Sequence, residues 1–441
     1  MPRIQLLLLL KSFIVGVGHS QIGLPTVNAS ELPIQYLSPG QTHVFKESIP
    51  LICVRDDIIE KESVQPDHLH KLIFVVRHKN MDQIVAILND ISNASSQNYR
   101  HHLSKEQIDN LTSNKESRAA VVSYLLSVGA SVSAGVQSWE YITATAPVGL
   151  WESFFQSTFY KYYQLQHDGS KKEFIRAHEY CLPTEMKDHI ESIFNIIQFP
   201  HRLSSKVRGL TNTLCPFAKS FDSDMSSEER SSAQSNFEKI SDFYETGSIK
   251  GNSLSSLGIF AMDHQCEGFD NLDSSHQISK YIFNNIEELS TVKGPNDLLT
   301  YLNYNMASSP GSPTLFHCTN AHFSDWLVMM ATIDSLPLVI SLAIDIPETY
   351  LSKAELDAFN ILAIKLTCMG ITIIAPSGYY FSTGDAGLGQ GTENQLKNSF
   401  IPSFPASNTY VTAVAISVVR PINFLILNIC RSDFHITYQV L

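Results

Sequence analysis

The sequence lacks several motifs that would assign it to a common enzyme class. It contains no His-Glu-x-x-His zinc motif, no Gly-x-Ser-x-Gly nucleophile turn and no Gly-Lys-Ser/Thr phosphate loop. Its seven cysteines include no Cys-x-x-Cys pair and no zinc-type spacing. These absences argue against metalloproteases, α/β-hydrolases and phosphate-loop enzymes, and we expect no metal or cofactor in this chain.

Positive charge is also scarce. The 31 lysines and arginines are outnumbered by 43 aspartates and glutamates, which gives a net charge of -12, and no basic block or basic aromatic stripe occurs. A nucleic-acid-binding face needs clustered lysine and arginine. We therefore expect no nucleic-acid partner.

Long hydrophobic runs are confined to the N-terminus. Arg3 is followed by an apolar run over residues 4–17, broken by Lys11, and then by small residues. This pattern predicts a signal peptide over residues 1–20 that is cleaved after Gly18 or Ser20. An N-terminal anchor or a buried helix is the alternative, although the run is short for a membrane span. We expect the secretory route and a lysosomal or extracellular location, with no stable membrane span. The Asn-x-Ser/Thr sites at Asn28, Asn93 and Asn110 agree with this.

Residues 68–200, after an N-terminal extension over 21–67, alternate between strand and helix patterns. A β-rich run at 71–78 precedes apolar residues at helical spacing over 81–91, a capping box at 104–107 and a helical segment that stops at Gly129. A strand, a short helix and an aromatic run follow. This order predicts a compact α+β domain in which helices cover one face of an antiparallel sheet.

Residues 201–250 are rich in serine, with little periodicity, and contain the basic residues Arg202, Lys206 and Arg208. Such a segment is typical of an exposed linker and of a place for proteolytic processing. An ordinary connector is the alternative interpretation.

Residues 251–419 contain short apolar runs separated by helical segments, which suits parallel strands buried on both faces. Ser352 and Glu355 form a capping box, and Gly370 ends the helix that they begin. Its apolar face comprises Leu356, Phe359, Leu362, Leu366 and Met369. The loop from Pro376, with the stretch Ser377–Gly387 and Asp385, follows a strand end, where sites in α/β folds occur. Asp385 is either an active-site acid or the polar tip of a surface loop.

Two groups of motifs resemble one known family. The first group is the string "HLHKLIFVVRHKNMDQIVAILNDISNASSQNYRHHLSKEQIDNL", with "VVSYLLSVGA" and "EYCLP". The second group is "LPLVISL", "CMGITIIAPSG" and "FIPSFPASNTYVTAV". The first resembles the activation propeptide of the sedolisin family, the serine-carboxyl peptidases, and the second resembles the family's subtilisin-like catalytic domain. Within the family, the sequence most resembles the animal members that release tripeptides. The resemblance implies an α+β propeptide domain followed by an incomplete α/β, subtilisin-like domain with a parallel sheet.

The resemblance also implies an acid-acting lysosomal zymogen that cleaves polypeptides. In the family a serine in a Gly-Thr-Ser motif is the nucleophile, a glutamate is the general base, and an aspartate four residues later orients it. A second aspartate, in a Ser-Gly-Asp turn, donates to the oxyanion, and complete members bind calcium.

This chain departs from that pattern at the base. The stretch "GPNDLLTYL" places Asn296 at the base position and Thr300 at the orienting position, and neither side chain can act as a carboxylate does. Asp297 is one residue away from the base position. Asp263 and Glu267 have the right spacing in the reversed order, and we favour surface acids for them.

The nucleophile is absent, because no Gly-Thr-Ser occurs in the 441 residues. The resemblance stops near Val419, before the family's serine and calcium segments, and residues 420–441 resemble nothing in the family. A genuine truncation and a splice or gene-model change both stay open.

At the substrate side "LAID" (342–345) replaces the family's Ser-Tyr-Gly. In the Ser-Gly-Asp turn, Tyr379 stands where the acid belongs, and Asp385 follows six residues on.

Three hypotheses follow. The chain is an active tripeptidyl peptidase, or a non-catalytic relative whose propeptide-like domain binds a peptidase domain as inhibitor or folding assistant, or an incomplete version of an active enzyme. We expect the partner to be a polypeptide substrate or a peptidase domain. The residues favour an inactive chain and leave the last two hypotheses open.

Overall fold

A computed structural model describes the chain over the ranges 43–49, 58–133, 138–165, 171–200, 257–262, 278–283, 314–319, 323–333, 336–342, 344, 346–377 and 402–414. All of them belong to one compact unit, Thr42–Leu441. Within it, we call the described residues of 43–200 the first domain and those of 257–414 the second domain. The predicted signal peptide, linker 201–250 and tail 420–441 lie outside the described residues.

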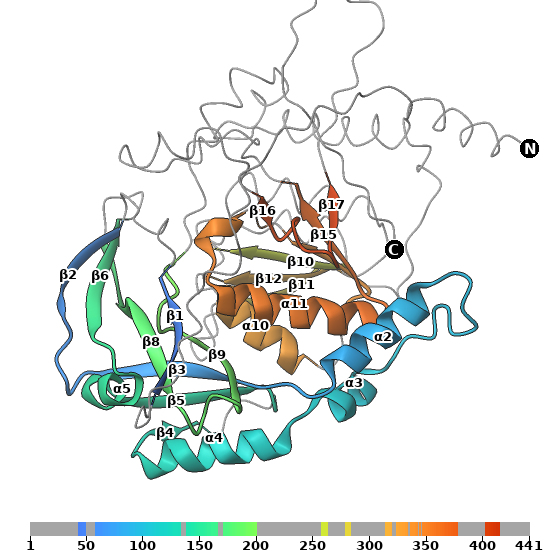
Figure 1. Cartoon of the computed structure of the whole chain (residues 1–441). Coiled ribbons are helices and arrows are strands. Elements are labelled where there is room, and N and C mark those ends of the chain that lie inside the picture. The colour runs from blue at the N-terminus through green and yellow to red at the C-terminus, as the bar shows by residue number, and fades with distance from the viewer. Residues whose placement is uncertain are drawn as a thin grey trace, which may run out of the picture. The chain divides into compact units, whose positions relative to one another are not determined.

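The first domain is built on a four-stranded antiparallel sheet with the order β4-β5-β3-β9 (Figure 1). These strands are β3 (Leu69–Val76), β4 (Ser131–Val132), β5 (Tyr141–Pro147) and β9 (Ile190–Phe194). Helices α4 (Lys115–Ser127) and α5 (Val148–Phe155) pack on it through a core that includes Phe74, Val121 and Trp151. The antiparallel sheet with packed helices agrees with the prediction of an α+β domain.

Five further strands extend this domain. β2 (Ile58–Ser63), β6 (Phe159–Leu165) and β7 (Lys171–Ala177) form an antiparallel three-stranded sheet, and β1 (His43–Ser48) pairs with β8 (Glu179–Pro183). β1 and β2 come from the segment predicted as an N-terminal extension. Their backbone hydrogen bonds therefore tie that segment to the α+β domain.

Local sequence signals predict the helices of this domain well. α2 (Met81–Ser92) buries Ile84, Leu88 and Ile91 along one face. α3 (Lys105–Thr112) begins with the capping box formed by Ser104 and Gln107. Gly129, which has φ +95°, follows α4, as expected for a glycine that ends a helix.

The second domain has a six-stranded sheet with the order β11-β12-β10-β13-β15-β17. Its strands are β10 (Leu257–Met262), β11 (Ile278–Phe283), β12 (Thr314–Thr319), β13 (Val339–Leu342), β15 (Thr372–Pro376) and β17 (Thr412–Val414). Neighbours pair in parallel, except that β11 pairs antiparallel with β12. The predicted parallel sheet is therefore mixed at one edge, because an added edge strand needs only an open row of backbone groups.

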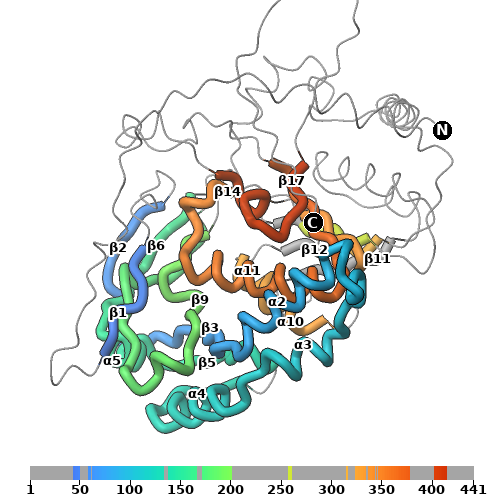
Figure 2. Tube along the Cα trace, turned by 45° about the vertical axis from the view of Figure 1, so that its right-hand side comes forward, coloured from blue at the N-terminus to red at the C-terminus, as the bar shows by residue number. Residues whose placement is uncertain are grey.

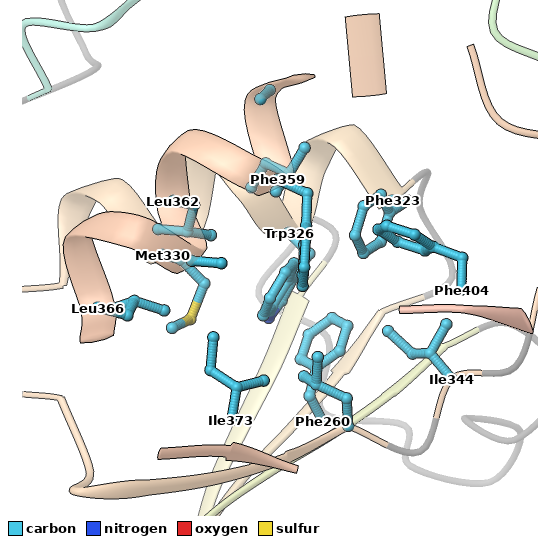
Figure 3. Close-up of a cluster of buried hydrophobic side chains, with 14 of the residues drawn as sticks. Phe260, Phe323, Trp326, Met330, Ile344, Phe359, Leu362, Leu366, Ile373 and Phe404 are labelled. Carbon is cyan, nitrogen blue, oxygen red and sulfur yellow. The ribbon is translucent and has the colours of Figure 1, made fainter. Parts of the chain in front are cut away.

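Helices α10 (Phe323–Thr332) and α11 (Lys353–Cys368) cover this sheet through an aromatic core (Figure 3). Trp326 and Phe359 lie with ring centroids 6.0 Å apart, and Phe404 meets Phe359 edge-on at 4.8 Å. Phe404 belongs to β16 (Ser403–Phe404), which pairs with β14 (Ile346–Pro347) just before the short 3₁₀ helix η4 (Glu348–Tyr350). No helix within the described ranges is long and apolar enough to cross a membrane.

Candidate functional site

The positions that the resemblance assigns to the catalytic site, Asn296, Thr300 and Asp385, lie outside the described residues. Asp297 and the acids favoured as surface residues, Asp263 and Glu267, lie outside them as well. The strand that should lead to the acid-bearing loop is present as β15, and the description of that loop ends at Ser377. Their roles therefore stay predictions.

The described residues instead bring together the two domains at helix α11. α2 lies beside α11 in both views (Figures 1 and 2), and the two helices share an apolar cluster. In that cluster Ile84, Leu88, Ile91 and Ile108 of the first domain meet Ile364 and Cys368 of α11. Ile73 and Phe194 of the first sheet join the core of the second domain. The surface between the domains is thus the candidate site for function by binding.

The first domain contacts the N-terminus of α11. Ser352 and Glu355 form the predicted capping box, and the Ser352 hydroxyl lies 2.9 Å from Glu355 Oε2. From the first domain, Gln198 Nε2 donates to Ser352 Oγ at 3.4 Å, and Glu47 Oε1 accepts from the Ala354 N–H at 3.4 Å. The free N–H groups of a helix start favour such acceptors. Burial raises the pKa of Glu47 to about 7, although the backbone N–H groups of α11 oppose this.

The first domain also contacts the C-terminus of α11. The Leu103 N–H donates to the Cys368 carbonyl at 2.9 Å, which is one of the carbonyls that a helix leaves without an internal partner. Cys368 Sγ lies 3.9 Å from the Ile84 carbonyl oxygen. Gly370, with φ +81°, then turns the chain toward β15, and a Cβ atom there would lie 2.7 Å from the His102 ring. The first domain therefore supplies hydrogen-bond partners at both ends of α11.

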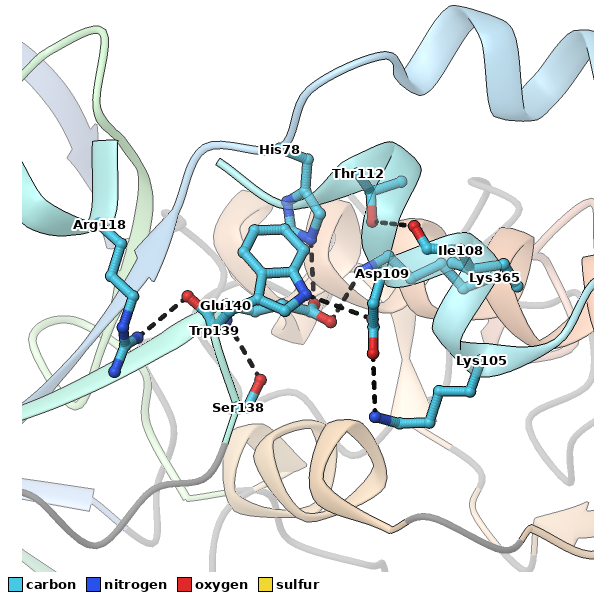
Figure 4. Close-up of polar contacts among 10 residues, drawn as sticks. All are labelled: His78, Lys105, Ile108, Asp109, Thr112, Arg118, Ser138, Trp139, Glu140 and Lys365. Carbon is cyan, nitrogen blue, oxygen red and sulfur yellow. Dashed lines mark hydrogen bonds and ion pairs between the residues drawn. The ribbon is translucent and has the colours of Figure 1, made fainter. Parts of the chain in front are cut away.

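Between these ends, a buried ion pair joins the two domains (Figure 4). Lys365 Nζ of α11 lies 2.7 Å from Glu140 Oε1, and Glu140 Oε2 lies 3.0 Å from His78 Nε2. The Lys365 ammonium also lies 4.9 Å from the centre of the Trp139 ring, whose indole N–H donates to Asp109. Glu140 and Lys365 are only 8% and 6% exposed.

The charges in this cluster depend on one another. Burial alone would raise the pKa of Glu140, but the Lys365 ammonium and the His78 ring outweigh it and hold the pKa at about 2. Burial lowers the pKa of His78, and the nearby Lys365 charge lowers it further. At neutral pH, Glu140 is therefore a carboxylate held by a lysine from the other domain and a neutral histidine from its own.

A second buried cation lies on the first-domain side of this surface. The Arg176 guanidinium donates to the Gln198 carbonyl and to Asn195 Oδ1, the latter at 3.3 Å. Burial lowers the pKa of Arg176 to about 10, while the charges of Asp325 and Glu355 from the second domain act against that shift. The surface thus places charges of opposite sign on its two sides.

Sequence analysis did not find these residues as a site. The capping box and the Gly370 stop define α11, and its predicted apolar face is confirmed at Phe359, Leu362 and Leu366. The second face, with Ile364, Lys365 and Cys368, is also buried. A lysine in an apolar helical surface is the one signal that could have indicated a buried partner. Within the described ranges, no three His, Cys, Asp or Glu side chains gather as metal ligands.

Comparisons with known proteins show which families and proteins this chain is similar to. Residues 56–199 match the family "Pro-kumamolisin, activation domain". The chain is 24% identical over 375 residues to tripeptidyl-peptidase 1 of Rattus norvegicus, a match that covers 80% of this chain and 62% of the relative. It is 23% identical over 373 residues to tripeptidyl-peptidase 1 of Homo sapiens, over 79% of this chain and 62% of the relative.

Among solved structures, the epidermin leader peptide processing serine protease (EpiP) from Staphylococcus aureus matches 78% of this chain and 69% of its own. Its sequence identity is 11% and its TM-score is 0.30. We draw nothing from so low a score. The chain spans less than two thirds of the length of those relatives. It is similar to the sedolisin family, with a match to the activation domain over residues 56–199 and a similarity to tripeptidyl-peptidase 1 over 80% of its length.

Proposed function

We propose that the activation domain of this chain functions by binding the peptidase-like domain through α11, as a zymogen-type partner. The observation that carries the proposal is that activation-domain groups bind the N-cap, the last turn and the final carbonyl of one helix. Gln198 contacts its N-cap, Glu140 pairs with Lys365, and Leu103 donates to its last carbonyl. Separation of the two sides would deprive the Leu103 N–H and the buried Glu140 and Lys365 charges of these partners, which is costly.

At the level of the family, the proposed activity is that of an acid peptidase zymogen. The relatives are tripeptidyl peptidases, so the proposed substrates are polypeptides, which lose tripeptides from their N-termini. We propose a lysosomal or extracellular location, which the predicted signal peptide supports.

We propose further that these 441 residues are not catalytic. The sequence contains no Gly-Thr-Ser, and Asn296 and Thr300 occupy the expected positions of the two carboxylates. Asp385 remains the proposed oxyanion acid, and an acid in that role assists only where a nucleophile attacks. No calcium site is proposed for this chain, because the family's calcium segment lies in the part that the resemblance does not reach.

Two measurements test this. The full transcript is sequenced, and the purified protein is assayed at acid pH for release of tripeptides from a peptide with a free N-terminus. An unchanged reading frame and no activity are expected. A transcript that restores Gly-Thr-Ser and upstream carboxylates, or tripeptide release by the 441-residue protein, would overturn the non-catalytic proposal.

The second candidate is inhibition of another peptidase in trans, which is favoured by the extent of the α11 surface. If the activation domain can exchange its own helix for that of a relative, adding the chain to an active tripeptidyl peptidase lowers its rate. The assay measures that rate against chain concentration at acid pH. An unchanged rate at a large molar excess contradicts the trans role and leaves the binding of the chain's own α11 unaffected.

A further inference from the structure

The pair Glu140–Lys365 has the properties of a selectivity contact and not those of a simple source of affinity. Two charges that leave water lose solvation, and their mutual attraction only about offsets that loss. A well-packed apolar pair would hold the domains at least as firmly. If one charge is removed, however, the other is buried without its counter-ion, which is strongly unfavourable. A buried ion pair across a surface therefore weakens the binding of partners that lack the counter-charge more than it strengthens the binding of the partner that has it.

The surroundings show which partner this contact fits. On the activation-domain side, Glu140 receives a hydrogen-bonding contact from the neutral His78, so the balancing positive charge comes from α11. Asp109 accepts a hydrogen bond from the Trp139 indole N–H, and its Oδ2 lies 3.1 Å from Lys105 Nζ. The Trp139 ring in turn faces the Lys365 ammonium. The remaining charged groups near the pair are Arg118, which donates to the carbonyls of Trp139 and Tyr141, and Glu191, which lies near His78.

Position along the helix adds a second criterion. Ser352 and Lys365 are separated by about 20 Å at the rise of an α-helix. Activation-domain groups bind at Ser352, at Lys365 and at the Cys368 carbonyl, which ends the helix. A helix of another length could not meet all three contacts. The apolar cluster beside Lys365 includes Ile364 and Cys368 of α11, and apolar contacts discriminate less sharply between partners than a buried charge that must be paired.

From these observations we propose that Glu140 selects the helix that the activation domain binds. It accepts a Ser-capped helix that carries lysine at the position of Lys365, and it rejects helices with a neutral or acidic side chain there. This inference rests on the proposed binding function and adds the rule by which the partner is chosen.

The test uses the full chain with a site-specific protease sequence inserted in the predicted linker, 201–250. The folded chain is cut at that site, and the association of the two pieces is measured on dilution by mass photometry at pH 7. Lys365→Met and Glu140→Met should each raise the dissociation constant by about 100-fold or more, from the cost of an unpaired buried charge. The double variant Glu140→Met/Lys365→Met should return to within about 10-fold of the unmodified pieces.

The outcomes separate the selectivity rule from the proposed function. Lys353→Met, at an exposed lysine of the same helix, is the control and should bind as the unmodified chain does. If the unmodified pieces separate as readily as the single variants, the binding function itself fails. If they stay together and either Lys365→Met also does or the double variant is as weak as the singles, the selectivity rule is overturned. Where a single variant does not fold, recovery of folding in the double variant supports the rule, and its absence contradicts it.

Discussion

At the residue scale, two titratable side chains of the first domain, His70 and Glu47, respond to pH in opposite directions. Burial lowers the pKa of His70 to about 4, with the Arg176 charge acting in the same sense, and raises the pKa of Glu47 to about 7. The contribution of His70 to the stability of the folded state therefore grows as the pH rises, and that of Glu47 grows as the pH falls. As the pH falls from neutral to acid, protonation of His70 therefore destabilises the folded chain, whereas protonation of Glu47 stabilises it.

His70→Gln is expected to make the chain less sensitive to acid. The ordinary pKa of 6.5 exceeds the folded value of about 4, so the native state loses up to about 3 kcal/mol of stability as the pH falls between these values. Glutamine stays neutral and can keep the contact with the Asn195 carbonyl. Denaturant unfolding at pH 7 and pH 4.5 measures the difference. His101→Gln, at an exposed turn, is the control, and an equally steep loss in His70→Gln would contradict the prediction.

Glu47→Gln is expected to have the opposite effect. The folded pKa of about 7 exceeds the ordinary 4.5, so this carboxyl contributes its stability below pH 4.5 and loses it as the pH rises through 7. An amide mimics the protonated acid at every pH. The stability gained over the unmodified chain should therefore grow from near zero at pH 4.5 to about 1–3 kcal/mol at pH 8. The same unfolding experiment measures it, and a gain that does not change with pH would refute the assignment.

At the scale of elements, two helices with the same capping box differ in where the box lies. Ser104 begins α3 at an exposed position, whereas Ser352 begins α11 at a buried one that also contacts Gln198. Ser104→Ala should cost about 1 kcal/mol, as caps usually do. Ser352→Ala should cost about 2 kcal/mol or more, because Glu355 and Gln198 both lose their contact with the hydroxyl. Chemical denaturation of both variants compares them, and equal costs would show that burial of the cap adds nothing.

The same helix shows how far sequence reasoning reaches. Its start, its end and its sheet-facing residues follow from local signals, namely Ser352, Gly370 and the apolar spacing of Phe359 and Leu362. Its other face depends on residues far away along the chain, and a single lysine among apolar neighbours does not tell which carboxylate it meets. Likewise, the sequence analysis did not predict β11 as a strand, and the structure identifies it by its pairing with β12. Local propensity therefore predicted the elements and not the surface between the two domains.

At the scale of the whole molecule, the two domains share cores and cannot be assigned separate stabilities. Ile73 and Phe194 of the first domain pack with Phe260 and Phe359 of the second. The cluster around Cys368 draws residues from both. Separation of the domains would expose this apolar surface, along with the Glu140–Lys365 charges. We therefore expect unfolding of the described parts as one cooperative unit.

The Cys368 thiol provides a direct measurement of that separation. Burial raises its pKa to about 11, and its sulfur lies against Ile84 of the other domain, so little reactive thiolate is present or accessible while the domains are joined. Cys181 is a free thiol that is partly exposed, and it serves as the internal reference. In the native chain at pH 7.5, Cys368 should react with a maleimide at least about 10-fold more slowly than Cys181, as measured by peptide mass spectrometry. Glu140→Gln should accelerate Cys368 and leave Cys181 unchanged, because it weakens the contact that closes the surface over α11. Equal rates for the two thiols in the native chain would mean that the surface between the domains opens readily.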